Sequence, residues 1–235
     1  MEELQRGIVG IAQTLRVVVL AVAIGCSGCH AVPADGPTTA QADRRFAIPP
    51  EWRPGDRWIY RSPNGSGTAT RTIEVREIRD VKGVKYYVLT NPDDDLLNFW
   101  TLDLRWAGAV GARDSKVEAR IDPPAPWFNW PLEPGRRWDH QAVYEDRGGK
   151  RAASDTFMVM GLEMIEVPAG RYQAMKIVRE GQSGDSDQYW YVPEVRSYAR
   201  WILKRSDKRV EEELVEYKPA DRLIPRPATP TSSPR

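Results

Sequence analysis

Alternation of apolar and polar residues predicts β-strands through most of the chain. Residues 70–78 (TRTIEVREI) alternate with a period of two, the pattern of a strand buried on one face. Aromatic and β-branched segments at 85–89, 174–178 and 188–192 give the same signal. The Glu-rich segment 210–217 is compatible with a helix, but its β-branched start and its lack of a capping signal favour a strand.

Two parts of the chain, about 52–122 and 132–218, show the same order of features. Each opens on Pro-Gly-x-x-Trp, at 54–58 and 134–138, and each then holds about six strand-like segments separated by turns. We therefore expect an all-β domain, a duplicated antiparallel meander of about twelve strands that forms a curved sheet or an open barrel. The alternative is two unrelated meanders that share turn chemistry.

A proline-rich segment, residues 122–131 (DPPAPWFNWP), joins the two copies. Its prolines exclude a central strand, because proline cannot donate a ladder hydrogen bond. Its aromatic residues Trp127, Phe128 and Trp130 are expected to pack into the core, and the alternative is that they line a mouth.

The N-terminus has the layout of a secretory signal. An apolar run, residues 17–24, follows Arg16 and leads through Gly25 to Cys26. This end of the run resembles the lipobox of bacterial lipoproteins, in which the cysteine becomes the acylated N-terminus. The resemblance implies lipidation of Cys26, with Cys29 as the alternative. A signal peptide cut near Ala23 and an uncleaved anchor are the other interpretations.

The same residues also spell C-x-x-C-H, the attachment pattern of c-type haem. A haem needs a surrounding pocket and usually a second axial ligand. His140 is the only histidine besides His30, and the stretch after His30 shows no amphipathic helix. We therefore expect no haem and no other cofactor.

Composition sets the domain organisation. We expect a signal peptide (1–25), a flexible tether (26–45), a β domain (46–222) and a disordered proline-rich tail (223–235). The chain has two cysteines, both before residue 30, so the β domain needs a hydrophobic core in place of disulfides. The 34 Lys plus Arg balance 33 Asp plus Glu, which gives no sign of a nucleic-acid partner.

Catalytic and metal-binding patterns are weak in this sequence. His140 beside Asp139 is expected to be a half-exposed histidine at the start of a strand, not a member of a catalytic triad. Residues 93–95 (DDD) lack the spacing of a calcium loop. Residues 211–213 (EEE) are expected on an exposed edge strand. The sequence therefore predicts no enzyme and no metal site.

Three motifs look like those of a group of uncharacterised bacterial envelope lipoproteins. They are the Pro-Gly-x-x-Trp entry at 134–138, the Val-Pro-Ala-Gly turn with its following strand at 167–177, and Tyr-Trp-Tyr-x-Pro-x-Val at 189–195. The family usually has glycine next, where this chain has Arg196. The resemblance implies an antiparallel β domain without an established activity. A more distant architectural likeness is to the curved half-barrels of lipoprotein carriers, which hold acyl chains in an apolar concavity.

Two functions are compatible with these features. The first is a lipid-anchored envelope protein, facing the periplasm or the cell exterior, whose non-catalytic β domain binds an apolar or lipid-like ligand. Its expected ligand-lining residues are Trp100, Trp106, Trp190 and Trp201. The second is a structural or assembly lipoprotein with a filled core, which contacts an envelope protein and no small ligand. Both have the membrane as a partner, through the N-terminal lipid.

Overall fold

The computed structural model describes residues 44–64, 67–92, 94–181, 184–205 and 208–220. Contacts within the chain separate Met1–Ala40 from Gln41–Arg235, and all described residues belong to the second unit. The predicted signal peptide, Cys26, Cys29 and the proline-rich tail lie outside the described residues. Among the residues that are described, no helix is long and apolar enough to cross a membrane.

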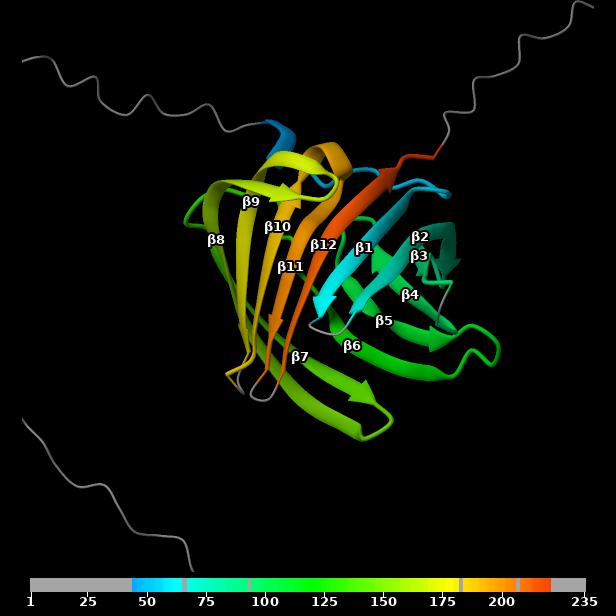
Figure 1. Ribbon diagram of the computed structural model, residues 1–235. Helices are drawn as coiled ribbons and strands as arrows, with labels where there is room; N and C mark the ends of the chain where they lie inside the picture. Colours follow the sequence, from blue (N-terminus) through cyan, green and yellow to red (C-terminus); the bar gives the residue numbers. More distant parts are fainter. Residues whose placement is uncertain (1–43, 65–66, 93, 182–183, 206–207, 221–235) are drawn as a thin grey trace, which may run out of the picture. The chain divides into compact units, whose positions relative to one another are not determined.

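Twelve antiparallel strands form a closed barrel (Figure 1). Each strand pairs with its neighbours in sequence, and the last strand pairs with the first. The prediction of an antiparallel all-β domain of about twelve strands is confirmed, and the sheet is closed where a curved sheet or an open barrel was expected. The strands are β1 (Arg57–Asn64), β2 (Gly67–Val81), β3 (Val84–Thr90), β4 (Leu96–Thr101), β5 (Trp106–Gly111), β6 (Val117–Ala125), β7 (Arg137–Asp146), β8 (Gly149–Val167), β9 (Gly170–Gly181), β10 (Ser186–Val192), β11 (Ser197–Lys204) and β12 (Arg209–Lys218), with two 3-10 turns, η1 (Arg44–Phe46) and η2 (Pro193–Val195).

The barrel closes where β1 pairs with β12. Trp58 lies opposite Tyr217, and their rings stack with centroids 5.5 Å apart. Closure leaves neither strand with a free edge, so the sheet needs no charged edge to discourage aggregation.

The expectation that residues 211–213 form an exposed edge is therefore wrong. Glu212 points into the barrel, is 7% exposed and forms an ion pair with Arg71. Glu211 lies on the outer face, where it pairs with Arg200. These glutamates are central-strand residues, and each has a basic partner on a neighbouring strand or, for Glu212, on β2, one strand further along the sheet.

The proline-rich segment also differs from its prediction, because β6 continues through Pro123 and Pro124 to Ala125. Its pairing with β7 ends at Asp122, and its pairing with β5 is interrupted between Arg120 and Ala125. The two prolines thus lie where neither neighbouring strand requires a backbone N–H donor.

One end of the barrel is covered by the segment before β1, the β6–β7 crossover and the η2 turn; we call it the closed end. Leu132 N donates to Phe46 O at 2.8 Å, which joins the crossover to the segment before β1. The Trp52 indole donates to the Arg196 main-chain oxygen at 2.7 Å, which joins the segment before β1 to the end of the η2 turn. Arg196 takes the left-handed conformation (φ 57°), which glycine adopts without steric cost.

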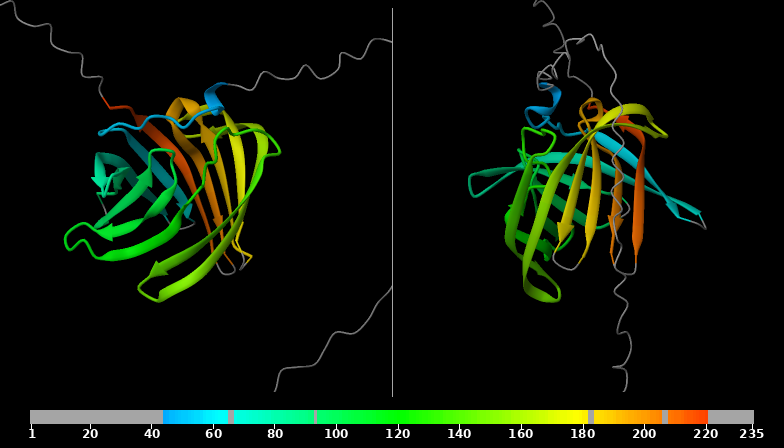
Figure 2. Two further views of the ribbon diagram at one scale, coloured as in Figure 1. Left: turned by 180° about the vertical axis from the view of Figure 1, so that it is seen from behind. Right: turned by 90° about the vertical axis from the view of Figure 1, so that its left-hand side faces the viewer.

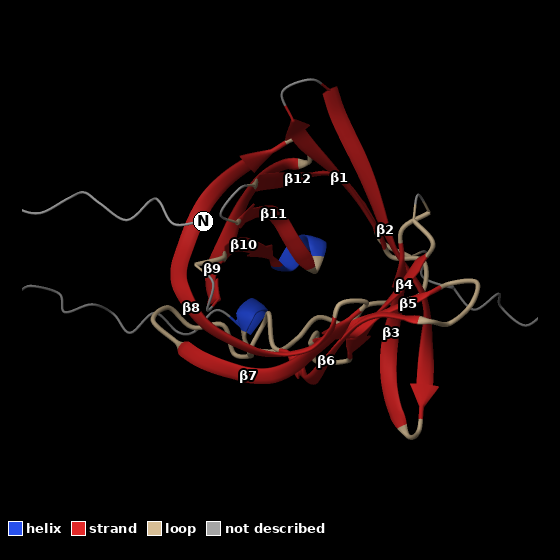
Figure 3. Ribbon diagram, turned by 90° about the horizontal axis from the view of Figure 1, so that it is seen from below, coloured by secondary structure: helices blue, strands red, loops and turns tan. Residues whose placement is uncertain are grey.

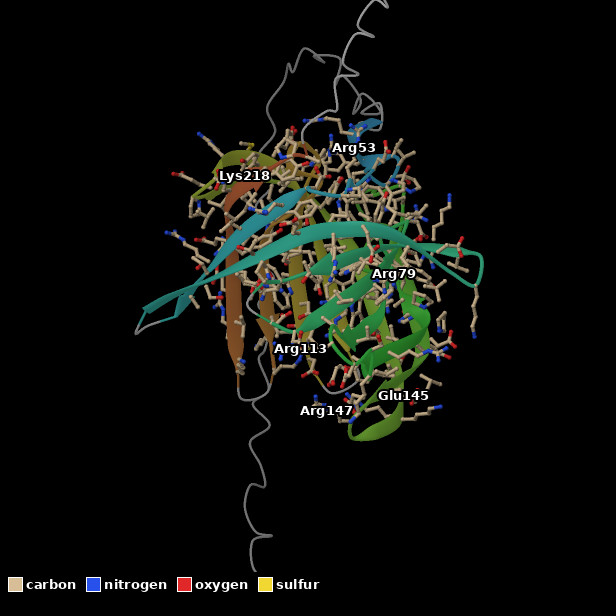
Figure 4. The ribbon with its side chains drawn as sticks, turned by 90° about the vertical axis from the view of Figure 1, so that its right-hand side faces the viewer. Arg53, Arg79, Arg113, Glu145, Arg147 and Lys218 are labelled. Atoms are coloured by element: carbon tan, nitrogen blue, oxygen red, sulfur yellow. The ribbon has the colours of Figure 1, made fainter. Side chains whose placement is uncertain are left out.

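The connections β1–β2, β3–β4, β5–β6, β7–β8, β9–β10 and β11–β12 lie toward the other end, the open end, because antiparallel hairpins alternate between the two ends of a barrel. Figure 3 looks into the barrel from this end, with the short 3-10 turns at its far side. Figure 4 shows the charged outer surface, with Arg53 and Lys218 toward the closed end and Glu145 and Arg147 at the β7–β8 turn.

The β8–β9 hairpin is the longest in the barrel, and its closed-end tip bends toward β12 (Figure 2). A bulge between Val159 and Gly161 interrupts its ladder, and bulges bend the strand that carries them. Ala169 N donates to Leu214 O on β12 at 2.9 Å, which fixes the tip. The hairpin therefore covers part of the outer face of the sheet.

The two Pro-Gly turns make equivalent backbone hydrogen bonds, which supports the predicted internal repeat. In each, the glycine donates to a buried valine on the second strand after the turn, β2 or β8, and that valine donates back to the residue after the glycine. The bonds are Gly55 N to Val75 O (2.7 Å), Val75 N to Asp56 O (2.9 Å), Gly135 N to Val159 O (2.8 Å) and Val159 N to Arg136 O (2.9 Å). The repeat itself stays a prediction.

Candidate ligand-binding lumen

A cavity of about 250 Å³ lies inside the barrel, and aromatic side chains form most of its wall. We call it the aromatic cavity. Its aromatic lining residues are Trp52, Trp58, Tyr60, Trp100, Trp106, Trp127, Phe128, Tyr198 and Trp201. Polar residues of the β3–β4 region, among them Asn91, Asp94 and Asn98, line the part nearest the open end. An apolar interior with polar groups at its rim is the usual composition of a small-molecule site.

Trp127 enters the barrel from the β6–β7 crossover. Its ring is perpendicular to that of Trp100, with centroids 5.1 Å apart, and lies 5.2 Å from the ring of Tyr189. The crossover aromatics were expected either to pack into the core or to line a mouth. Trp127 lines the cavity, and Phe128 does both, since it lines the cavity and is only 3% exposed. The crossover thus forms part of the cavity wall as well as covering the closed end.

Three of the four predicted lining residues, Trp100, Trp106 and Trp201, lie together in this wall. The fourth, Trp190, lies on the outer face of β10, because side chains alternate along a strand and its neighbour Tyr189 points inward. Its indole donates to Glu163 Oε2 at 2.8 Å, and Lys176 Nζ lies 4.9 Å from the ring. Trp190 is thus placed to fix the β8–β9 hairpin to the outside of the sheet.

Sequence reasoning missed Trp52 and Trp58 as lining residues and gave a lining role to Trp127 only as the alternative to core packing. Trp58 and Tyr60 occupy alternate positions on β1 and therefore share the inner face, a signal that was available in the sequence. Trp52 and Trp127 lie outside the strands, where no periodicity reports the direction of a side chain.

Arg71 is the one cationic residue that lines the aromatic cavity among the described residues. Its guanidinium forms an ion pair with Glu212, donates to the Tyr198 hydroxyl at 3.1 Å, and lies 5.9 Å from the centre of the Tyr60 ring. Burial raises the pKa of Tyr198 to about 12, so this hydroxyl stays protonated at neutral pH. The positive charge of Arg71 is therefore compensated by one carboxylate inside the barrel.

A second hollow of about 480 Å³, the charged hollow, adjoins the aromatic cavity. Trp106, Trp127 and Trp201 line both. Its wall includes Asp185 and Arg205 from the turns of the open end. The interior of the barrel is thus aromatic in one compartment and charged in the next.

Ion pairs connect the charges of this hollow. Arg179 pairs with Asp155 and, at 2.5 Å, with Asp187. Arg205 pairs with Asp185 at 3.3 Å and with Asp187 at 3.4 Å. Burial by itself raises the pKa of the Asp155 carboxyl, but the nearby His140 and the charge of Arg179 outweigh it and hold that pKa below its usual value.

His140 is buried, so the expectation of a half-exposed histidine is wrong. It is 6% exposed, because it shares the inner face of β7 with Trp138 and lies opposite Asp155 of β8. Its Nε2 lies 3.0 Å from Pro123 O, and its Nδ1 lies 3.8 Å from an Asp155 oxygen. The ring is thus held between a carbonyl and a carboxylate in the interior of the barrel.

No group of three or more His, Cys, Asp or Glu side chains is arranged to hold a metal ion in the described parts of the chain. In the DDD segment, Asp93 lies outside the described residues. Asp94 accepts from Leu96 N and from Asn91 Nδ2, both at 3.2 Å, which shapes the β3–β4 turn.

No protein-family model matches the chain, and a search of curated proteins finds no match. Solved structures similar to it include a candidate exported protein with a YmcC-like fold from Bacteroides fragilis (13% identity, TM-score 0.43, covering 73% of this chain and 99% of that one). A candidate lipoprotein from Parabacteroides distasonis is 15% identical (TM-score 0.39, covering 74% and 98%). The hypothetical lipoprotein YmcC from Escherichia coli is 14% identical (TM-score 0.38, covering 73% and 90%). These structural neighbours are thus described as exported proteins or lipoproteins, and the likeness to them is remote.

Proposed function

We propose that this protein is a lipid-anchored envelope protein whose non-catalytic barrel binds an apolar, lipid-like ligand in the aromatic cavity. The observation that carries the proposal is a cavity of about 250 Å³ walled by six tryptophans inside a closed barrel. Protein cores normally interdigitate with few voids larger than a water molecule. Large aromatic side chains that leave such a space are better explained by a ligand than by core packing.

Binding is tested with N-phenyl-naphthylamine, an uncharged probe that fluoresces in apolar surroundings. Wild-type protein should bind about one probe per chain with saturation. Ile73→Trp, which adds bulk at a residue lining the cavity, should abolish binding. Ile78→Trp, the same change at a 45% exposed position of the same strand, is the matched control and should leave binding intact. Non-saturable fluorescence, or equal binding by both variants of verified fold, would contradict the proposal.

The anchor is proposed at Cys26, on the sequence pattern described above. Intact-mass measurement of protein purified from bacterial membranes should show acylation in wild type and in Cys29→Ala, and its loss in Cys26→Ala. The reverse pattern would move the anchor to Cys29. A haem adduct, or an unmodified N-terminus after residue 23, would refute the anchor.

The alternative is a structural or assembly role, and apolar side chains on the outer surface support it. Met158 and Met160 are 38% and 51% exposed on β8, and Val143 is exposed on the neighbouring strand β7. Exposed apolar groups can mark a contact with another protein. This role requires no ligand, so saturable probe binding that depends on residue 73 separates the two functions.

A further inference from the structure

We infer that the ligand has no net charge at the end that enters the barrel, which makes it an uncharged amphiphile such as a long-chain alcohol, ester or amide. The inference rests on the proposed function and specifies its ligand. It follows from how the charges that line the two compartments are already paired.

In the aromatic cavity, Arg71 is the residue whose charge would attract an anionic ligand. The Arg71 guanidinium is already paired with Glu212, which is 7% exposed, and Asp94 adds another carboxylate to the lining. A ligand carboxylate beside Arg71 would therefore lose its hydration and be repelled by Glu212, whose carboxylate already compensates that cation. The cavity disfavours fatty acids and other anions.

In the charged hollow, the three arginines of the wall are paired as well. Arg179 and Arg205 hold the three aspartates described above, and Arg151 pairs with Asp146 at 2.7 Å. Neither an ammonium nor a carboxylate group of a ligand meets an uncompensated opposite charge there. Burying an unpaired ion costs far more than burying a neutral polar group that finds a hydrogen bond.

Neutral polar groups in the wall suit an uncharged ligand. Thr90, Asn98 and Ser197 line the aromatic cavity, and the Asn98 carbonyl accepts a 3.4 Å hydrogen bond from the Trp106 indole. Amide and hydroxyl groups of this kind donate to and accept from an alcohol, an ester or an amide without any charge to neutralise. Both compartments therefore favour the same ligand class.

The test is displacement of N-phenyl-naphthylamine by dodecanol, dodecanoate and dodecylammonium, which share one chain length and differ in charge. With wild-type protein at neutral pH, dodecanol should displace the probe at concentrations about tenfold lower than either ion. Glu212→Gln leaves the Arg71 charge uncompensated and should shift the preference toward dodecanoate by about tenfold. Glu211→Gln, the same change at the adjacent residue on the outer face, should leave the wild-type order unchanged.

The outcomes separate this inference from the proposed function. Equal displacement by dodecanoate and dodecanol in wild type would overturn the inference and leave the proposed function standing. A probe that does not bind wild-type protein would refute the proposed function itself. Because the wild-type comparison needs no variant, the inference stays testable even where Glu212→Gln fails to fold.

Discussion

The Trp58 indole nitrogen donates a 2.6 Å hydrogen bond to the main-chain oxygen of Val195, 137 residues further along the chain. Trp58 and Val195 are 2% and 3% exposed, so water cannot replace either partner. The bond joins the start of β1 to the η2 turn across the closed end. It therefore links the first strand of the barrel to a turn between two of its last strands.

Replacing Trp58 with phenylalanine should lower the free energy of unfolding by about 2–3 kcal/mol, because the Val195 oxygen loses its partner and apolar contacts are lost. Trp201→Phe removes a buried indole N–H that has no hydrogen-bond partner, so its cost should be below about 1 kcal/mol. Urea unfolding followed by circular dichroism measures both. Equal losses would show that the bond to Val195 contributes nothing.

Arg179 should be among the most sensitive charged positions of the barrel. Arg179→Met leaves Asp155 and Asp187 buried without their shared cation, and we expect a loss of about 3–5 kcal/mol. Arg147→Met breaks the pair with Glu118 at a side chain that is 74% exposed, and should cost less than about 1 kcal/mol. Urea midpoints of the two variants decide the point, and a small effect at Arg179 would contradict the described network.

Stability should fall in acid partly through Asp155. Its pKa is lower in the folded protein than in the unfolded chain, so its ionised form stabilises the fold above the ordinary carboxyl pKa. That contribution is lost as the pH falls through the lowered value. Asp155→Asn should therefore be less stable than wild type at neutral pH, by a difference that shrinks below about pH 4.

The comparison is made by urea unfolding at a series of pH values. Asp139→Asn serves as the control, since Asp139 lies opposite Thr156 on the same pair of strands but its side chain is 69% exposed. Its difference from wild type should stay small throughout. A difference for Asp155→Asn that does not change with pH would rule out this linkage.

Gly108 should not tolerate a side chain. It has φ +145°, and an added Cβ would lie 2.3 Å from Ala119 O on the neighbouring strand. Gly108→Ala should cost about 3 kcal/mol, and Gly83→Ala about 1 kcal/mol, because Gly83 has φ +84° but no atom within 4 Å of the added carbon. Thermal unfolding of both variants measures which one loses more stability. A loss at Gly108→Ala no larger than that at Gly83→Ala would contradict this prediction.

Period-two alternation allowed the strands to be predicted from sequence, including β12, whose glutamates also suit a helix. Closure could not be predicted, because the pairing of Trp58 with Tyr217 joins the two ends of the domain and has no local signal. The burial of Glu212 has the same origin, since its partner Arg71 lies across the β1–β12 seam.

The misplacement of Trp190 has a different cause. Residues 189–192 (YWYV) are all buried, because the bent β8–β9 hairpin covers the outer face where Trp190 lies. A strand buried on both faces shows no alternation, so its sequence does not report which side chains point inward. The fold brings Trp100, Trp106 and Trp201 together in one cavity wall, as the sequence predicted. Their role as ligand contacts stays a proposal.

The most direct test of the lumenal site is native mass spectrometry of the full-length protein purified from bacterial membranes, with its bound lipids identified after extraction. We predict one uncharged amphiphile per chain in wild type and in Ile78→Trp, and an unloaded chain in Ile73→Trp. An unloaded wild-type chain, or a ligand that Ile73→Trp retains, would contradict the account.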